Sequence, residues 1–70
     1  MTEVEVQKLQ KYLRDKFGNE NFRLVDRIKS EDSVEVYLSE EFISTLYRDD
    51  EDGEISYDFN MAILEMDLPQ

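Results

Sequence analysis

The sequence predicts a two-layer α+β domain, in which one N-terminal amphipathic helix packs on a four-stranded antiparallel meander sheet. Apolar residues recur at intervals of three and four up to about residue 17, and from about residue 21 they alternate with polar residues. The alternating runs are joined by short polar turns, as in a meander. A chain of 70 residues has room for one domain, which we expect to span residues 1–70.

The helix is expected over about residues 2–17. Its apolar stripe consists of Val6, Leu9, Leu13 and Phe17, with Tyr12 beside it. Thr2 and Glu5 have the spacing of a capping box, in which each side chain bonds to the backbone of the other residue. Gly18 can adopt the left-handed conformation that ends a helix, so we expect the helix to stop there.

Strands are expected over about residues 21–28, 33–38, 42–48 and 54–64. Phe22, Leu24 and Ile28 alternate in the first of them. An acidic hairpin loop ending at Gly53 joins the third strand to the fourth, and Gly53 is available for a positive φ. Residues 59–68 remain ambiguous, because their pattern suits either a continued strand or a short helix.

Alternation assigns the strand residues to two faces of the sheet. The face toward the helix is expected to carry Phe22, Leu24, Val34, Val36, Leu38, Phe42 and Leu46. The opposite face is expected to carry Arg23, Val25, Arg27, Glu35, Tyr37, Ile43, Thr45 and Tyr47. This mixed face is either a solvated surface or a docking surface, because Tyr and Arg are frequent interface anchors. The candidate docking residues are Arg23, Val25, Arg27, Tyr37, Ile43 and Tyr47.

The chain is strongly acidic, with 18 acidic side chains, 8 basic ones and a net charge of −10. Such a charge repels phosphate backbones and anionic lipids, so we expect neither nucleic acid nor a membrane as partner. The acidity either keeps the protein in solution or meets a basic partner, including by mimicry of nucleic acid. Cys is absent and no leader or membrane segment is recognisable, which favours the cytoplasm.

Residue types common in catalysis are missing. The chain has no His and no Cys, which excludes the usual nucleophile–base pairs. Its two glycines, Gly18 and Gly53, are too few for a phosphate-binding loop. We therefore expect no enzyme, no catalytic residues and no cofactor.

The acidic hairpin over residues 49–54 is the one segment that suggests a metal site. If Gly53 took the place of the calcium-loop glycine, Asp50 and Asp52 would stand at ligand positions. The first ligand position would then fall on Arg48 and the last on Phe59, which cannot bind calcium. A charged hairpin is the simpler interpretation, and weak divalent-cation binding by Asp50 and Asp52 is the alternative.

Several short segments together resemble a known family across nearly the whole chain. They are Lys11-Tyr12-Leu13-Arg14, Phe17-Gly18, Val34-Glu35-Val36-Tyr37, Glu41-Phe42-Ile43, Tyr47-Arg48-Asp49-Asp50-Glu51-Asp52-Gly53, Ser56-Tyr57 and Met61-Ala62-Ile63-Leu64. The chain resembles a family of short uncharacterised alphaproteobacterial proteins, a domain of unknown function. The resemblance implies an alphaproteobacterial origin and a cytosolic context. It implies no activity, cofactor or catalytic residue.

These observations predict a non-enzymatic interaction or assembly module. It would either self-associate or dock on a larger protein through the mixed face of the sheet. The alternative is a divalent-metal or small-ligand-binding domain that uses the hairpin over residues 49–54.

Overall fold

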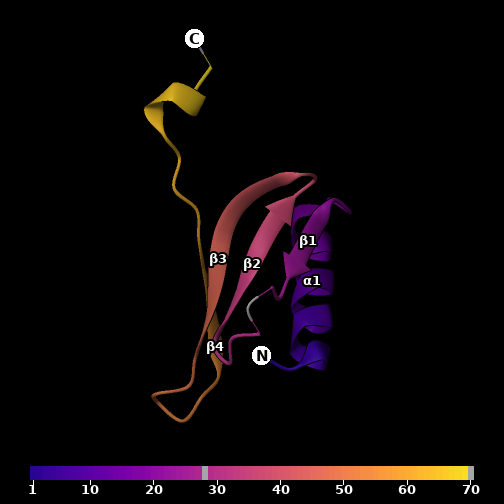
Figure 1. The fold of residues 1–70 in the computed structure, drawn as a ribbon, viewed down its shortest axis with the longest axis vertical. Coiled ribbons are helices and arrows are strands. Elements are labelled where there is room, and N and C mark those ends of the chain that lie inside the picture. The colour runs from indigo at the N-terminus through magenta and orange to yellow at the C-terminus, as the bar shows by residue number, and fades with distance from the viewer. Residues whose placement is uncertain (28, 70) are drawn as a thin grey trace.

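The computed structural model describes residues 1–27 and 29–69 and confirms the α+β fold (Figure 1). Helix α1 (Glu3–Phe17) precedes strands β1 (Phe22–Val25), β2 (Ser33–Leu38), β3 (Glu41–Asp49) and β4 (Ser56–Asn60), and the short 3₁₀ helix η1 (Glu65–Asp67) follows them. The sheet order is β1-β2-β3-β4, and each strand is antiparallel to the one before it. The sheet is therefore the meander that the sequence predicts.

Helix α1 begins and ends as its sequence predicts. The Glu5 backbone N–H donates to the Thr2 hydroxyl at 3.1 Å, and the Glu5 carboxylate accepts from the Thr2 backbone N–H at 3.1 Å. This reciprocal pair is the predicted capping box. Gly18 ends the helix at a φ of +59°, and its N–H donates to the Arg14 carbonyl. A side chain at this position would be strained, so glycine is favoured there.

The core lies between α1 and one face of the sheet. Its buried apolar residues are Leu13, Phe22, Leu24, Val34, Val36 and Leu46. Val36 is fully buried at the middle of β2, the strand that β1 and β3 flank. The helix contributes Leu13 as its one buried side chain, and the sheet supplies the rest. The sheet is thus the larger contributor to the core.

The first strand is shorter than predicted. It was expected over residues 21–28 but ends at Val25, and Ile28 lies outside the described residues. Beyond Val25 the N-terminal ammonium of Met1 donates to the Ser30 carbonyl, which ties the loop to the start of α1. Lys29 has a φ of +52°, a left-handed conformation that interrupts extended structure. Both features lie in the connection between β1 and β2.

A β-bulge corrects the predicted faces of β3. Val36 pairs with Ser44 whereas Tyr37 pairs with Phe42, so Ile43 is the extra residue. Phe42 consequently lies on the face away from α1, beside Tyr37, although alternation had placed it toward the helix. Ile43 packs against the core instead of lying on the outer face. Ser44, not an apolar residue, takes the buried place next to Val36.

The fourth strand also ends early, at Asn60 instead of residue 64. Its last pair joins Asn60 to Thr45, and the bulge in β3 follows directly. The buried Ser44 hydroxyl donates to the Asn60 carbonyl at this point. Residues 61–69 then leave the body as an exposed tail that projects beyond the sheet (Figure 1). The tail contains η1 but no further strand, so both readings of residues 59–68 are only partly correct.

Candidate functional site

The candidate site is the sheet face opposite α1, which we call the open face. It consists of Arg23, Val25, Arg27, Glu35, Tyr37, Phe42, Thr45 and Tyr47. Its side chains are exposed or half-buried, whereas the alternate residues of the same strands form the core. The open face is therefore presented to solvent by a packed layer beneath it.

Four side chains of the open face form one connected cluster, which we call the arginine–aromatic cluster: Arg23, Arg27, Tyr37 and Phe42. The Arg23 guanidinium lies over the Tyr37 ring, 5.3 Å from its centroid. The Tyr37 and Phe42 rings meet edge to face at 5.7 Å between centroids. Arg27 Nη2 donates to the Tyr37 hydroxyl at 2.7 Å. Tyr37 is thus held on three sides.

Phe42 is a member of this cluster that alternation missed. The bulge at Ile43 reverses the face of the residues before it, so the strict two-residue period fails there. In the structure Phe42 closely follows the turn residues Ser39-Glu40, and Ser39 has a φ of +57°. Short hairpin loops that contain a left-handed residue commonly carry a bulge.

The open face also contains a hollow, which lies beside the arginine–aromatic cluster and shares Arg27 with it. Val25, Arg27, Thr45 and Tyr47 line it together with Glu35. Arg27 Nε lies 3.3 Å from Glu35 Oε1 and forms an ion pair across the hollow's edge. The structure thereby brings together five of the six predicted docking residues, namely Arg23, Val25, Arg27, Tyr37 and Tyr47. The sixth, Ile43, is directed into the core.

A second polar cluster was missed altogether by the sequence analysis. Glu5 of α1, Arg48 of β3 and Tyr57 of β4 meet between the helix and the sheet. The Tyr57 hydroxyl donates to Glu5 Oε2 at 2.7 Å, and Arg48 Nε lies 3.1 Å from the same oxygen. Sequence separation hides this cluster, because Glu5 and Tyr57 are 52 positions apart.

The three groups shift one another's pKa values. The hydrogen bond from Tyr57, supported by the Thr2 backbone and by Arg48, lowers the pKa of Glu5. The same hydrogen bond to Glu5, together with burial, raises the pKa of Tyr57. Desolvation opposes the charge on Arg48, yet the carboxylates of Glu5 and Asp50 raise its pKa overall. Together the shifts favour an ionised Glu5, a neutral Tyr57 and a charged Arg48. In these charge states the three side chains connect α1 to the sheet.

The acidic hairpin does not gather its carboxylates around one point. Asp50 pairs with Arg48 at 3.2 Å, and the Asp49 side chain accepts from the Glu51 backbone N–H at 3.0 Å. Asp52 is exposed at the tip. In residues 1–27 and 29–69 no group of three His, Cys, Asp or Glu side chains is placed to hold a metal ion. Asp49 caps the turn, as the simple hairpin interpretation expects.

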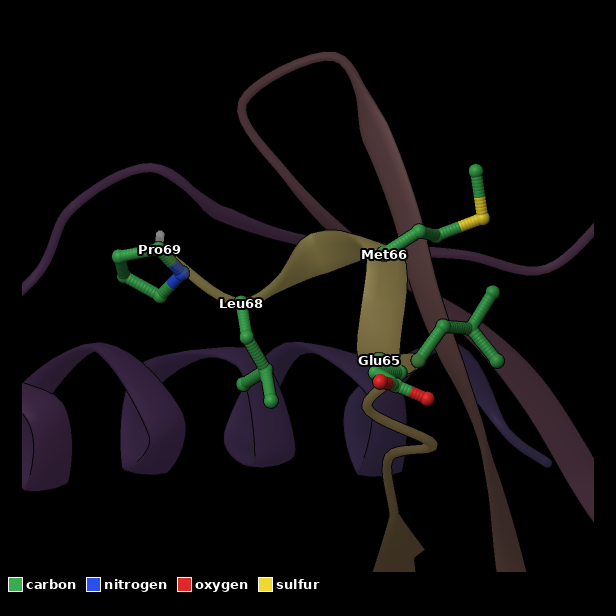
Figure 2. Close-up of a pocket in the computed structure, with 5 residues that line it drawn as sticks. Glu65, Met66, Leu68 and Pro69 are labelled. Atoms are coloured by element: carbon green, nitrogen blue, oxygen red, sulfur yellow. The ribbon is translucent and has the colours of Figure 1, made fainter.

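One hollow on the molecule belongs to the tail alone. Figure 2 shows it at η1, where Met66 and Leu68 point away from each other. Its lining comes entirely from Leu64, Glu65, Met66, Leu68 and Pro69. Because no side chain of the folded body contributes to it, this hollow is not a site for a ligand.

A family model matches residues 5–67, with the description "Protein of unknown function (DUF3126)". The chain belongs to this family. The DUF3126 match spans almost all of α1, the four strands and η1, so the open face and most of the tail fall within it. It confirms the predicted resemblance to a domain of unknown function. No curated protein and no solved structure matches the chain.

A helix that crosses a bilayer needs about 20 predominantly apolar residues. Within the part of the chain that the structure describes, neither α1 nor η1 could cross a membrane.

Proposed function

We propose that this chain is a non-enzymatic interaction module that docks on a larger protein in the alphaproteobacterial cytoplasm through its open face. One observation carries the proposal, which is the arginine–aromatic cluster on a sheet face that no second layer covers within residues 1–27 and 29–69. Arg and Tyr dominate the energetically important positions of protein interfaces. The cluster therefore has the residue types of a binding hot spot.

The contacts within the cluster reduce the cost of binding. Immobilising a free side chain at an interface costs about 0.5–1.5 kcal/mol. Tyr37 is already fixed by the Arg23 guanidinium, the Phe42 ring and the Arg27 donor. Its conformational entropy is thus largely lost before any partner arrives, which favours association.

The chemistry of the open face indicates what a partner offers. Arg23 makes only long hydrogen bonds, of 3.3 and 3.4 Å, to the Ser39 carbonyl, so its guanidinium retains donors for a carboxylate. Phe42 and Tyr47 are about half exposed and offer apolar area beside it. We expect a partner surface with a carboxylate next to an apolar or aromatic side chain.

Affinity capture from an alphaproteobacterial cytosolic extract tests this proposal. Tyr47→Ala and Phe42→Ala should each lower recovery of a stoichiometric partner by about tenfold, the effect of removing a hot-spot contact. Tyr12→Ala is the matched control, because Tyr12 is as exposed as Tyr47 but lies on α1. Circular dichroism should show all three variants folded. Equal recovery by the three variants would contradict docking through the open face.

A further inference from the structure

The two edges of the sheet differ in how their backbone groups are satisfied. At the β1 edge, Gln10 Oε1 accepts from the Leu24 backbone N–H at 3.0 Å. On the same edge, Arg14 Nε donates to the Phe22 carbonyl at 2.8 Å. Both side chains come from α1, which thereby closes this edge to any further strand.

The β4 edge remains open. The Arg48 N–H donates to the Asp32 carbonyl, so Arg48 turns its backbone groups toward the β2 side. By alternation, the next residue, Asp49, bonds to β4, where its partner is Ser56. The backbone groups of Tyr57 and Phe59 therefore point away from β3. In the described residues no protein hydrogen bond reaches them.

The residues whose backbone groups point away from β3 are also the apolar ones of β4, with Tyr57 and Phe59 packing their side chains against the core. Their alternating pattern continues past the end of β4. Ile55, Tyr57, Phe59, Met61 and Ile63 alternate with polar or small residues. Only the part up to Asn60 pairs with β3. Met61 and Ile63 are 50% and 67% exposed, so the tail carries a strand pattern without a strand to pair with.

We infer that two copies of this chain pair antiparallel along their β4 edges, with a two-fold axis at Phe59 and with each strand lengthened to Ile63. In this register Phe59 lies opposite Phe59 of the other copy, Tyr57 opposite Met61, and Ile55 opposite Ile63. The outward backbone groups of both strands are then satisfied, and one eight-stranded sheet spans the two copies. This surface is separate from the open face, so the inference does not depend on the proposed function.

Self-complementarity identifies the occupant as a second copy. A symmetric interface requires one segment to match itself when reversed, and the alternating run is centred on Phe59. Between the apolar pairs, Asp58 faces Asn60 and Ser56 faces Ala62, so no two carboxylates are opposed. A register centred on Tyr57 would place Gly53 opposite Met61 and Glu51 opposite Ile63. The apolar side chains of the tail would then have no apolar partners across the interface.

Sedimentation equilibrium of the full chain tests the inference with a matched pair of variants. We expect a dimer whose affinity rises with salt, because each copy carries a charge of −10. Met61→Asp, which sets a carboxylate opposite Tyr57, should raise the dimer dissociation constant by about tenfold or more. Met66→Asp adds the same charge outside the paired run and should leave dimerisation unchanged.

A distance measurement fixes the register. The chain has no Cys, so Ser56→Cys carries a single spin label. Six residues separate the two copies of position 56 along the paired strands, which predicts a separation of about 20 Å at about 3.4 Å per residue.

A chain that stays monomeric, a dimer that is insensitive to Met61→Asp, or a clearly different distance would each overturn the inference. Tyr47→Ala should still dimerise and Met61→Asp should still capture a partner. Failure of the β4 interface and failure of the open face are therefore distinguishable.

Discussion

At the scale of single residues, the tie between Glu5, Arg48 and Tyr57 holds α1 against the far side of the sheet. Their side chains are only partly exposed, at 23% for Glu5 and 26% for Arg48. Arg48 is the only basic residue in the strongly acidic segment after residue 30, and it offsets both Glu5 and Asp50. A charge arrangement of this kind makes stability depend on pH.

Acidification should weaken this tie. The folded pKa of Glu5 lies below the usual 4.5, so the unfolded chain binds more protons there, and stability falls as pH drops through that window. Urea unfolding of the wild type and of Glu5→Gln from neutral pH to about pH 3 measures the effect. The stability difference between the two should shrink at low pH. A constant difference would mean that ionisation of Glu5 contributes nothing.

The raised pKa of Tyr57 predicts the opposite dependence at alkaline pH. The neutral phenol is favoured in the folded state, so its contribution is complete below about pH 10 and is lost as pH rises through the folded pKa. Tyr57→Phe removes the titrating hydroxyl and should flatten the alkaline part of the stability profile. Tyr12→Phe on the exposed side of α1 is the control that should leave the profile as it is.

At the scale of elements, local rules predicted where each element lies but not every end. The capping box at Thr2 and the glycine at position 18 set the helix ends by local chemistry, so they were readable from sequence. The ends of β1 and β4 depend on partners, namely the Met1 contact to Ser30 and the bulge in β3. Contacts between distant segments leave no periodic signal in the chain.

The bulge gives Phe42 and Ile43 different energetic roles, because Ile43 packs against the core and Phe42 lies on the open face. Ile43→Asp would place an unpaired charge against the core and should lower the free energy of unfolding by on the order of 3 kcal/mol. Phe42→Asp lies on the open face and should cost roughly 1 kcal/mol or less. Chemical denaturation of both variants measures this. Equal losses would indicate that β3 continues without the bulge.

At the scale of the whole molecule, five of the six candidate docking residues lie on the open face, four of them because alternation holds along β1, β2 and most of β3. Ile43 was placed wrongly and Phe42 was missed for one reason, the single extra residue in β3. The contacts of Tyr37 with Arg23 and Arg27 join strand β1 and the loop after it to β2, so they follow from pairing register, which the sequence left open.

The net charge of −10 should make the thermal stability of the whole molecule depend on salt concentration. Self-repulsion disfavours the compact state, and added salt screens it. Raising NaCl from about 0.02 M to about 0.5 M should raise the thermal midpoint by about 5 °C. The Met61→Asp variant is the suitable chain for this measurement, because it removes the expected effect of self-association. A midpoint that falls with salt would show that attractive ion pairs outweigh the repulsion.

The meander order of the sheet has a consequence for how the chain folds. Each strand pairs with its immediate predecessor, so every hairpin closes a short loop and carries a small entropic cost. The hydrogen bond between Glu5 and Tyr57 closes almost the whole chain instead. The hairpins are therefore suited to form early, and we expect the contact between Glu5 of α1 and Tyr57 of β4 to form last. Pairing between successive strands favours faster folding than a sheet built from strands distant in sequence.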